Sequence, residues 1–138
     1  MNYNKSTLLA YSLADSTVPV NGNISFSNSQ ITGCSIRFSA GASQITLANP
    51  GLYQVLFDAD SVTGTGTVTA QLYKNGTAVQ GAVSSDTLAA GDTGNLDFNT
   101  IINVERNCCC GSETTLAVLN TGVEATYNNT SIIIIKLA

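Results

Sequence analysis

Ser131-Ile132-Ile133-Ile134-Ile135-Lys136-Leu137 is the strongest structural signal in this sequence of 138 residues. Isoleucine is β-branched, so four isoleucines in succession favour a strand over a short helix. Side chains on a strand alternate between the two faces of its sheet, and here both sets are largely apolar. The segment is also well below the roughly 18 apolar residues that cross a bilayer as a helix. It therefore predicts a strand that is buried on both faces.

A strand of this kind needs an apolar partner on each side. One face can enter the core of the domain itself, whereas a two-layer antiparallel fold leaves the other face to solvent. The sequence has no helical periodicity that would provide a cover, so we expect another copy of the chain there. Lys136 alternates with Ile132 and Ile134, and a buried lysine is costly unless it is paired. We therefore expect the face of Ile132 and Ile134 to meet other copies, and the opposite, fully apolar face to enter the core.

The rest of the chain consists of short strand candidates separated by glycine, proline and asparagine turns. Asn75-Gly76 is the clearest turn, because a two-residue hairpin loop with both residues at positive φ matches the twist of its strands. The polar segment 81–92 is expected to be a loop. Expected strands cover residues 7–11, 23–26, 35–39, 44–47, 52–62, 67–74, 96–104, 114–119 and 131–137. We predict an all-β protein, an antiparallel jelly-roll sandwich of about 8–10 strands. Residues 7–138 would form its single domain, after a short arm of residues 1–6.

Leu52, Leu56 and Ile101 lie on the strand faces opposite to the expected core residues. A single exposed leucine carries no information, but strands with apolar second faces indicate a continuous patch. Monomeric proteins rarely expose such a patch. We predict that these three residues form a homotrimer interface together with Ile132 and Ile134.

The composition argues against several classes of function. Charged residues make up 10% of the chain, and five scattered basic residues against nine acidic ones give a net charge of −4. The chain therefore has no basic stripe for nucleic acid. It has no histidine, no Gly-x-Ser-x-Gly elbow and no glycine-rich phosphate loop, so we expect no enzymatic activity. The first residues lack a signal-peptide core and no membrane span follows, so we expect synthesis in the cytoplasm and no membrane association.

The four cysteines have an unusual spacing. Cys34 stands alone and is expected in the core, while Cys108, Cys109 and Cys110 are consecutive. Adjacent cysteines rarely bridge each other, so free thiols that pack as small hydrophobic groups are the first interpretation. The alternative is that this loop reaches a threefold axis, where one thiolate from each of three chains would bind zinc. No other cofactor is expected.

Asp58 and Asp60 are two residues apart, so both carboxylates lie on one face of a strand. Such a pair could share a calcium ion with main-chain oxygens. A solvated strand end is the other interpretation.

Three stretches carry a resemblance to a known family: Asn49-Pro50-Gly51-Leu52-Tyr53, Leu72-Tyr73-Lys74-Asn75-Gly76-Thr77 and residues 132–137. In their order and spacing they resemble the jelly-roll superfamily of tumour necrosis factor and the complement globular heads. Within it, the chain is similar to the bacterial branch, which includes the C-terminal heads of spore-surface collagen-like proteins and domains of phage structural proteins. The resemblance implies a ten-stranded jelly roll that forms a tight homotrimer, with the last strand in the sheet that faces the threefold axis. The chain has no Gly-X-Y repeat, so the collagen stalk of the spore proteins is not expected.

From this resemblance we expect a structural and interaction module that decorates or projects from a larger assembly. A phage virion is the expected location, where the chain would serve as a capsid decoration or head-fibre protein. The alternative is a head domain for carbohydrate or host-receptor attachment on a phage, spore or cell surface. Surface glycans are bound by stacking on an exposed aromatic ring, for which the candidates are Tyr3, Tyr11, Tyr73 and Tyr127.

Overall fold

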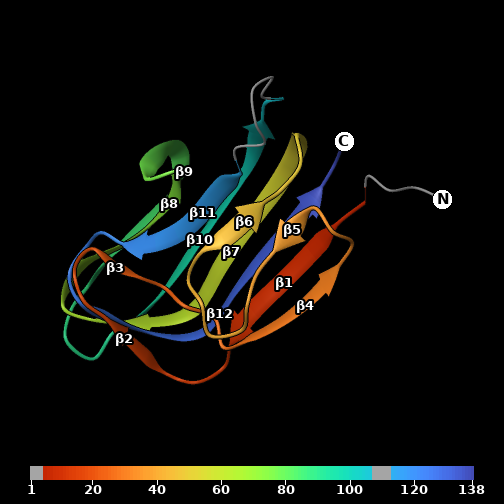
Figure 1. Cartoon of the computed structure of the whole chain (residues 1–138). Helices are drawn as coiled ribbons and strands as arrows, with labels where there is room; N and C mark the ends of the chain where they lie inside the picture. The colour runs from red at the N-terminus through yellow and green to blue at the C-terminus, as the bar shows by residue number, and fades with distance from the viewer. Residues whose placement is uncertain (1–4, 107–112) are drawn as a thin grey trace.

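The computed structural model of the chain describes residues 5–106 and 113–138. These residues form twelve strands and no helix (Figure 1), so none of the described segments is a helix able to cross a membrane. Eight strands have five or more residues, and the other four have two or three. The strands are β1 (Thr7–Ser12), β2 (Ser16–Val18), β3 (Gly22–Asn23), β4 (Asn28–Thr32), β5 (Ile36–Arg37), β6 (Ile45–Leu47), β7 (Gly51–Thr63), β8 (Gly66–Lys74), β9 (Thr77–Leu88), β10 (Thr93–Val104), β11 (Thr114–Asn120) and β12 (Ala125–Lys136).

The strands form two antiparallel sheets that pack face to face, which confirms the predicted all-β sandwich. In sheet A the order is β10-β7-β12-β1-β4, with β2 also paired to β12. In sheet B the order is β5-β6-β11-β8-β9, with β3 also paired to β11. The first and the last long strands of the chain are thus neighbours in sheet A, as Figure 1 shows.

The core lies between the two sheets and is filled by alternate residues of each strand. In β7 these are Tyr53, Val55, Phe57 and Ala59, all at most 1% exposed, as the sequence predicts. Phe57 stacks on Phe98 of the neighbouring strand, with ring centroids 5.1 Å apart. Aromatic pairs of this kind stabilise a core beyond the area that they bury.

The turn at Asn75-Gly76 follows the sequence prediction. Asn75 and Gly76 have φ values of 52° and 81°, as required by the two-residue hairpin between β8 and β9. Gly51 has a φ of 148° at the start of β7. A Cβ atom there would overlap the main-chain oxygen of Ala138, so this position requires glycine for lack of space as well.

The predicted loop at residues 81–92 is wrong, because most of it belongs to β9. The pairing of β8 with β9 shifts register between Gln71 and Tyr73, and Gly81 has a φ of 85° within the extra residues of β9. The Gln71 Nε2 donates to the main-chain oxygens of Val79 and Ala82, at 2.7 and 3.1 Å, and so holds this bulge. A bulge places turn-like residues inside a strand, and its sequence therefore resembles a loop.

Cys34 is also placed differently from its prediction. It lies in the connection between β4 and β5 and is exposed, not part of the core. The consecutive cysteines Cys108, Cys109 and Cys110, with their proposed zinc site, lie outside the described residues.

Candidate interface on the outer face of sheet A

The face prediction for β12 is wrong in its orientation. Ile132 and Ile134 are fully buried in the core of the protomer, so they cannot form an interface with another copy. Ile133 is 37% exposed and Leu137 is 52% exposed on the outer face of sheet A. The strand does have two apolar faces, but the exposed one is the face without the lysine.

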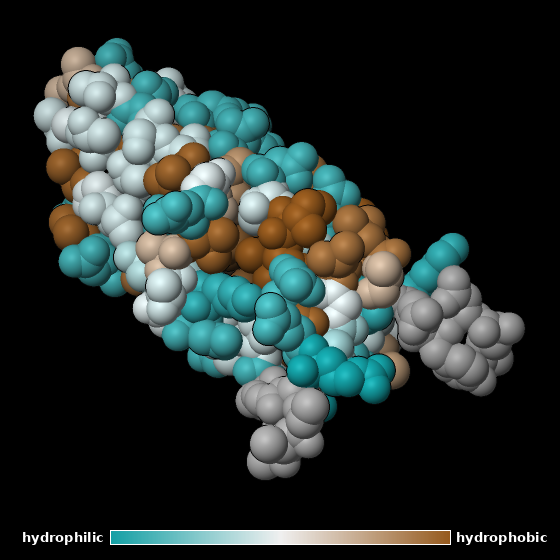
Figure 2. Space-filling view, turned by 90° about the horizontal axis from the view of Figure 1, so that it is seen from above, coloured by the Kyte–Doolittle hydropathy of each residue, from teal (hydrophilic) through white to brown (hydrophobic). Residues whose placement is uncertain are grey.

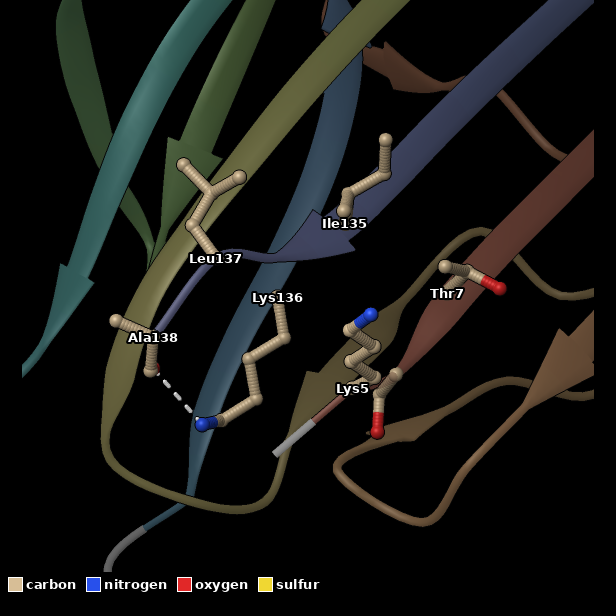
Figure 3. Close-up of a pocket in the computed structure, with 7 residues that line it drawn as sticks. Lys5, Thr7, Ile135, Lys136, Leu137 and Ala138 are labelled. Atoms are coloured by element: carbon tan, nitrogen blue, oxygen red, sulfur yellow. Dashed lines mark hydrogen bonds between the residues drawn. The ribbon is translucent and has the colours of Figure 1, made fainter. Parts of the chain in front are cut away.

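The environment of Lys136 explains this error. The side chain is only 7% exposed, and its Nζ donates to the main-chain oxygen of Ala138 at 2.8 Å. The Nζ also lies 5.9 Å from the ring centroid of Tyr53. Because Lys136 ends its strand, the long side chain reaches this partner at the end of the sandwich while remaining on the core side. Figure 3 shows Lys136 pointing away from Ile135 and Leu137.

The outer face of sheet A carries four of the eight large hydrophobic side chains that are exposed in the described residues. The strand register brings further apolar side chains beside these four, because Ile133 pairs with Leu56 on one side and with Leu9 on the other. A main-chain hydrogen bond of 2.7 Å from Leu137 N to Leu52 O joins the next pair. Figure 2 shows a continuous hydrophobic patch with a polar border on one face of the molecule. We call the following residues of sheet A the apolar patch: Leu9, Leu52, Leu56, Ile101, Ile133, Ile135 and Leu137.

Three of the five predicted interface residues, Leu52, Leu56 and Ile101, thus lie in the apolar patch. The prediction missed Leu9, which lies on β1 directly opposite Ile133. The alternation of residues 7–11 contains a signal for it, since Leu9 and Leu8 point to opposite faces.

A hollow of about 480 Å³ adjoins the apolar patch at one end of sheet A (Figure 3). It lies between the segment that leads into β1 and the segment that follows β12. Its lining residues are Lys5, Ser6, Thr7, Ile135, Lys136, Leu137 and Ala138. The hollow therefore extends the apolar patch into a concave surface.

An acidic cluster lies on the same face of sheet A. Asp58 of β7 is paired with Asp97 of β10, and Asp60 follows two residues further on. Burial, together with the neighbouring Asp60 and Asp97 carboxylates, raises the pKa of Asp58. Residues 5–106 and 113–138 contain no group of three acidic, cysteine or histidine side chains that could hold a metal ion.

The raised pKa of Asp58 predicts a pH dependence of stability. The folded chain holds this proton more tightly than the unfolded chain, so stability falls as the pH rises through the range above the unfolded value of 3.8. At neutral pH the penalty is fully present. The variant Asp58→Asn should therefore melt at a higher temperature than the wild type at pH 7, and the difference should disappear near pH 3.

Thermal unfolding followed by circular dichroism at both pH values measures this difference. Glu124→Gln removes one negative charge from an exposed position elsewhere and controls for net charge. Equal melting temperatures of Asp58→Asn and the wild type at pH 7 would contradict the prediction.

The tyrosines proposed for sugar stacking differ in accessibility. Tyr127 is 1% exposed and buried in the core, so that candidate is wrong. Tyr11 is half-buried on sheet A, and Tyr3 lies outside the described residues. Tyr73 is half-buried and lines a cavity of about 310 Å³ on sheet B.

Comparison with known proteins identifies the fold. The sequence matches no protein-family model and no curated protein. Among solved structures, the globular domain of zebrafish complement 1qA is similar with a TM-score of 0.67 and 10% identity, over 95% of both chains. Murine APRIL at pH 5.0 is similar with a TM-score of 0.66 and 12% identity, over 96% of this chain and 99% of that one.

A third similar structure is the PRD1 vertex protein P5, with a TM-score of 0.54 and 18% identity over 100% of both chains. All three comparisons cover nearly the whole sandwich, and at these identities they establish the fold. The chain therefore has the same jelly-roll fold as the complement 1qA globular domain, APRIL and the vertex protein P5.

Proposed function

We propose that this chain is a non-enzymatic structural module that forms a homotrimer through the apolar patch. The observation that carries the proposal is the clustering of exposed hydrophobic side chains on the outer face of sheet A. Ile101, Ile133, Leu52 and Leu137 are 37–52% exposed in the protomer. Exposed apolar patches that are bordered by polar groups mark association sites, because burying them removes apolar surface from water.

The position of β12 supports a trimer in particular. The family resemblance implies a threefold axis along the sheet that contains the last strand. In this fold β12 is the middle strand of the five-strand order of sheet A, and Ile133 lies near the centre of the apolar patch. Each protomer would bury this face against its two neighbours, as in obligate oligomers whose interfaces resemble a core cut in half.

The proposed location is a phage particle, with the trimer as a capsid decoration or head fibre. The full-length similarity to the PRD1 vertex protein P5 supports this location. A role as an interaction module agrees with the neutral surface, of which charged residues are a small part. Mass spectrometry of purified virions from the source of the sequence should detect its peptides, and their absence from intact particles would exclude the location.

Light scattering during size-exclusion chromatography tests the oligomer. At micromolar concentration the wild-type chain should have a mass three times 14.3 kDa. A protein of 14.3 kDa at that concentration would overturn the proposed trimer.

A further inference from the structure

The outer face of sheet B carries a hollow that is separate from the apolar patch. Its volume is about 310 Å³, at the lower end of the roughly 300–1,000 Å³ that is typical of small-molecule sites. It is lined by Asn23, Gln44, Tyr73, Gly76, Thr115, Ala117 and Leu119. Because the two sheets pack face to face, this hollow and the apolar patch lie on opposite sides of the sandwich.

Tyr73 forms one wall of the hollow, and its side chain is half-buried between two small neighbours. The strand register places Ala117 of β11 on one side of Tyr73 and Ala78 of β9 on the other. A methyl group is too short to cover an aromatic ring. The part of the ring that borders the hollow beside Ala117 is therefore accessible to a ligand, to which it offers a flat apolar surface.

Two amide side chains form the opposite wall. Gln44 is exposed and directly precedes β6, so the pairing of Ile45 with Leu116 brings it opposite Ala117. Asn23 of β3 lies opposite Leu119, and its Nδ2 donates to Ser43 Oγ at 3.2 Å. That bond fixes the Asn23 amide and leaves its oxygen as an acceptor. Since strands lie about 4.8 Å apart, the main chains at Tyr73 and Gln44 are about 10 Å apart, with Ala117 between them.

The lining selects the class of ligand. It contains no charged side chain, so nothing in it pairs with a phosphate or a carboxylate. The strands beneath it, β8 and β11, are paired on both sides, so a peptide cannot add as a further strand. Amides and a threonine hydroxyl disfavour a purely apolar ligand. A sugar ring fits, because it has an apolar face for the aromatic ring and hydroxyl groups at its edge for the amides.

We propose that this hollow binds one residue of a neutral carbohydrate. The sugar ring stacks on Tyr73 above Ala117, and its hydroxyl groups exchange hydrogen bonds with the amides of Gln44 and Asn23. The site does not depend on the proposed trimer, because all its residues belong to the sheet B side of the protomer.

An array of immobilised neutral, sialylated and sulfated glycans provides the first test. The wild-type chain should retain at least one neutral glycan. Titration of the matching methyl glycoside, followed by saturation-transfer NMR, then measures the affinity of each variant. Tyr73→Ala removes the stacking wall and Ala117→Leu fills the floor, and each should weaken binding by roughly tenfold or more. Gln44 lies outside the strands, so Gln44→Ala tests the opposite wall of the hollow without disturbing the sheet.

Val83→Ala is the matched control, since Val83 is a 43% exposed residue of β9 outside the hollow, and it should bind like the wild type. Circular dichroism confirms that each variant is folded. The site is disproved if no neutral glycan is retained, if only sialylated or sulfated glycans are retained, or if Ala117→Leu and Gln44→Ala both bind as the wild type does. The Ile133→Asp variant separates this result from the oligomer, because Ile133 lies on sheet A and a monomer should keep the same affinity for the methyl glycoside.

Discussion

Ile134→Asp is expected to leave the chain unfolded, whereas Ile133→Asp is expected to give a folded monomer. The two residues are adjacent, but Ile134 is 0% exposed between the sheets and Ile133 is 37% exposed in the apolar patch. A carboxylate at position 134 would be buried without a partner, at a cost of about 4 kcal/mol or more, which is a large part of the roughly 5–15 kcal/mol that stabilises a domain. At position 133 the carboxylate remains hydrated in the monomer and opposes only the association of copies.

Circular dichroism and light scattering of both variants measure folding and mass. The conservative variants Ile134→Val and Ile133→Val should remain folded, because each loses only one methylene group. Ile101→Asp, at a 51% exposed position of the same patch, provides a second monomer if the proposed interface is real. A folded Ile134→Asp would contradict the core assignment, and trimeric Ile133→Asp and Ile101→Asp variants would show that the patch is not the interface.

Asn120→Ala is expected to destabilise the fold by roughly 3–5 kcal/mol, because it leaves several buried groups without a partner. Asn120 is 0% exposed, and its Nδ2 donates to the main-chain oxygens of Val18 at 3.0 Å and Val123 at 2.9 Å. Its Oδ1 accepts from the Tyr127 hydroxyl at 2.8 Å. One amide therefore joins β11, β12 and the end of β2, and it is out of contact with solvent in the folded chain.

Urea unfolding of the wild type and the variant gives the difference in the free energy of unfolding. Tyr127→Phe is the matched control, since it removes only the hydroxyl group and should cost about 1–2 kcal/mol. The double variant should lose less free energy of unfolding than the sum of the two single losses, because both substitutions remove the same hydrogen bond. A loss below that of Tyr127→Phe alone would mean that the Asn120 network adds little to stability.

The sequence predicted the long strands because hydrophobic alternation survives wherever one sheet face is buried. Residues 52–62 and 96–104 alternate over most of their length and were placed correctly in β7 and β10. The sequence did not predict β4. Asn28–Thr32 is an edge strand with almost no buried side chain, so its sequence shows no alternation of apolar and polar residues. Part of β9 was mistaken for a loop because its bulge contains Gly81 at positive φ.

The choice between the two faces of β12 could not be made from residues 131–137 alone. The alternation correctly separates the residues into two sets, but the single charge of Lys136 does not mark the solvent side. The partner of Lys136 is a main-chain oxygen, and a main-chain oxygen leaves no trace in a sequence. Part of the hollow on sheet B could be predicted from the sequence, because the Asn75-Gly76 turn places Ala78 opposite Tyr73. The positions of Asn23 and Gln44 could not, because they depend on the pairing of the complete sheet.

The place of β12 between β1 and β7 also governs when the chain can fold during its synthesis. Both neighbours leave the ribosome earlier than β12, so sheet A cannot close until residues 125–136 have emerged. Until then the sheet has an open gap with unpaired main-chain groups, and such long-range pairing is slow. The isoleucine run that fills the gap is itself a β-forming, uncharged segment prone to aggregation while it is exposed. Rapid closure of sheet A therefore competes with misassembly from the time at which residues 125–136 emerge.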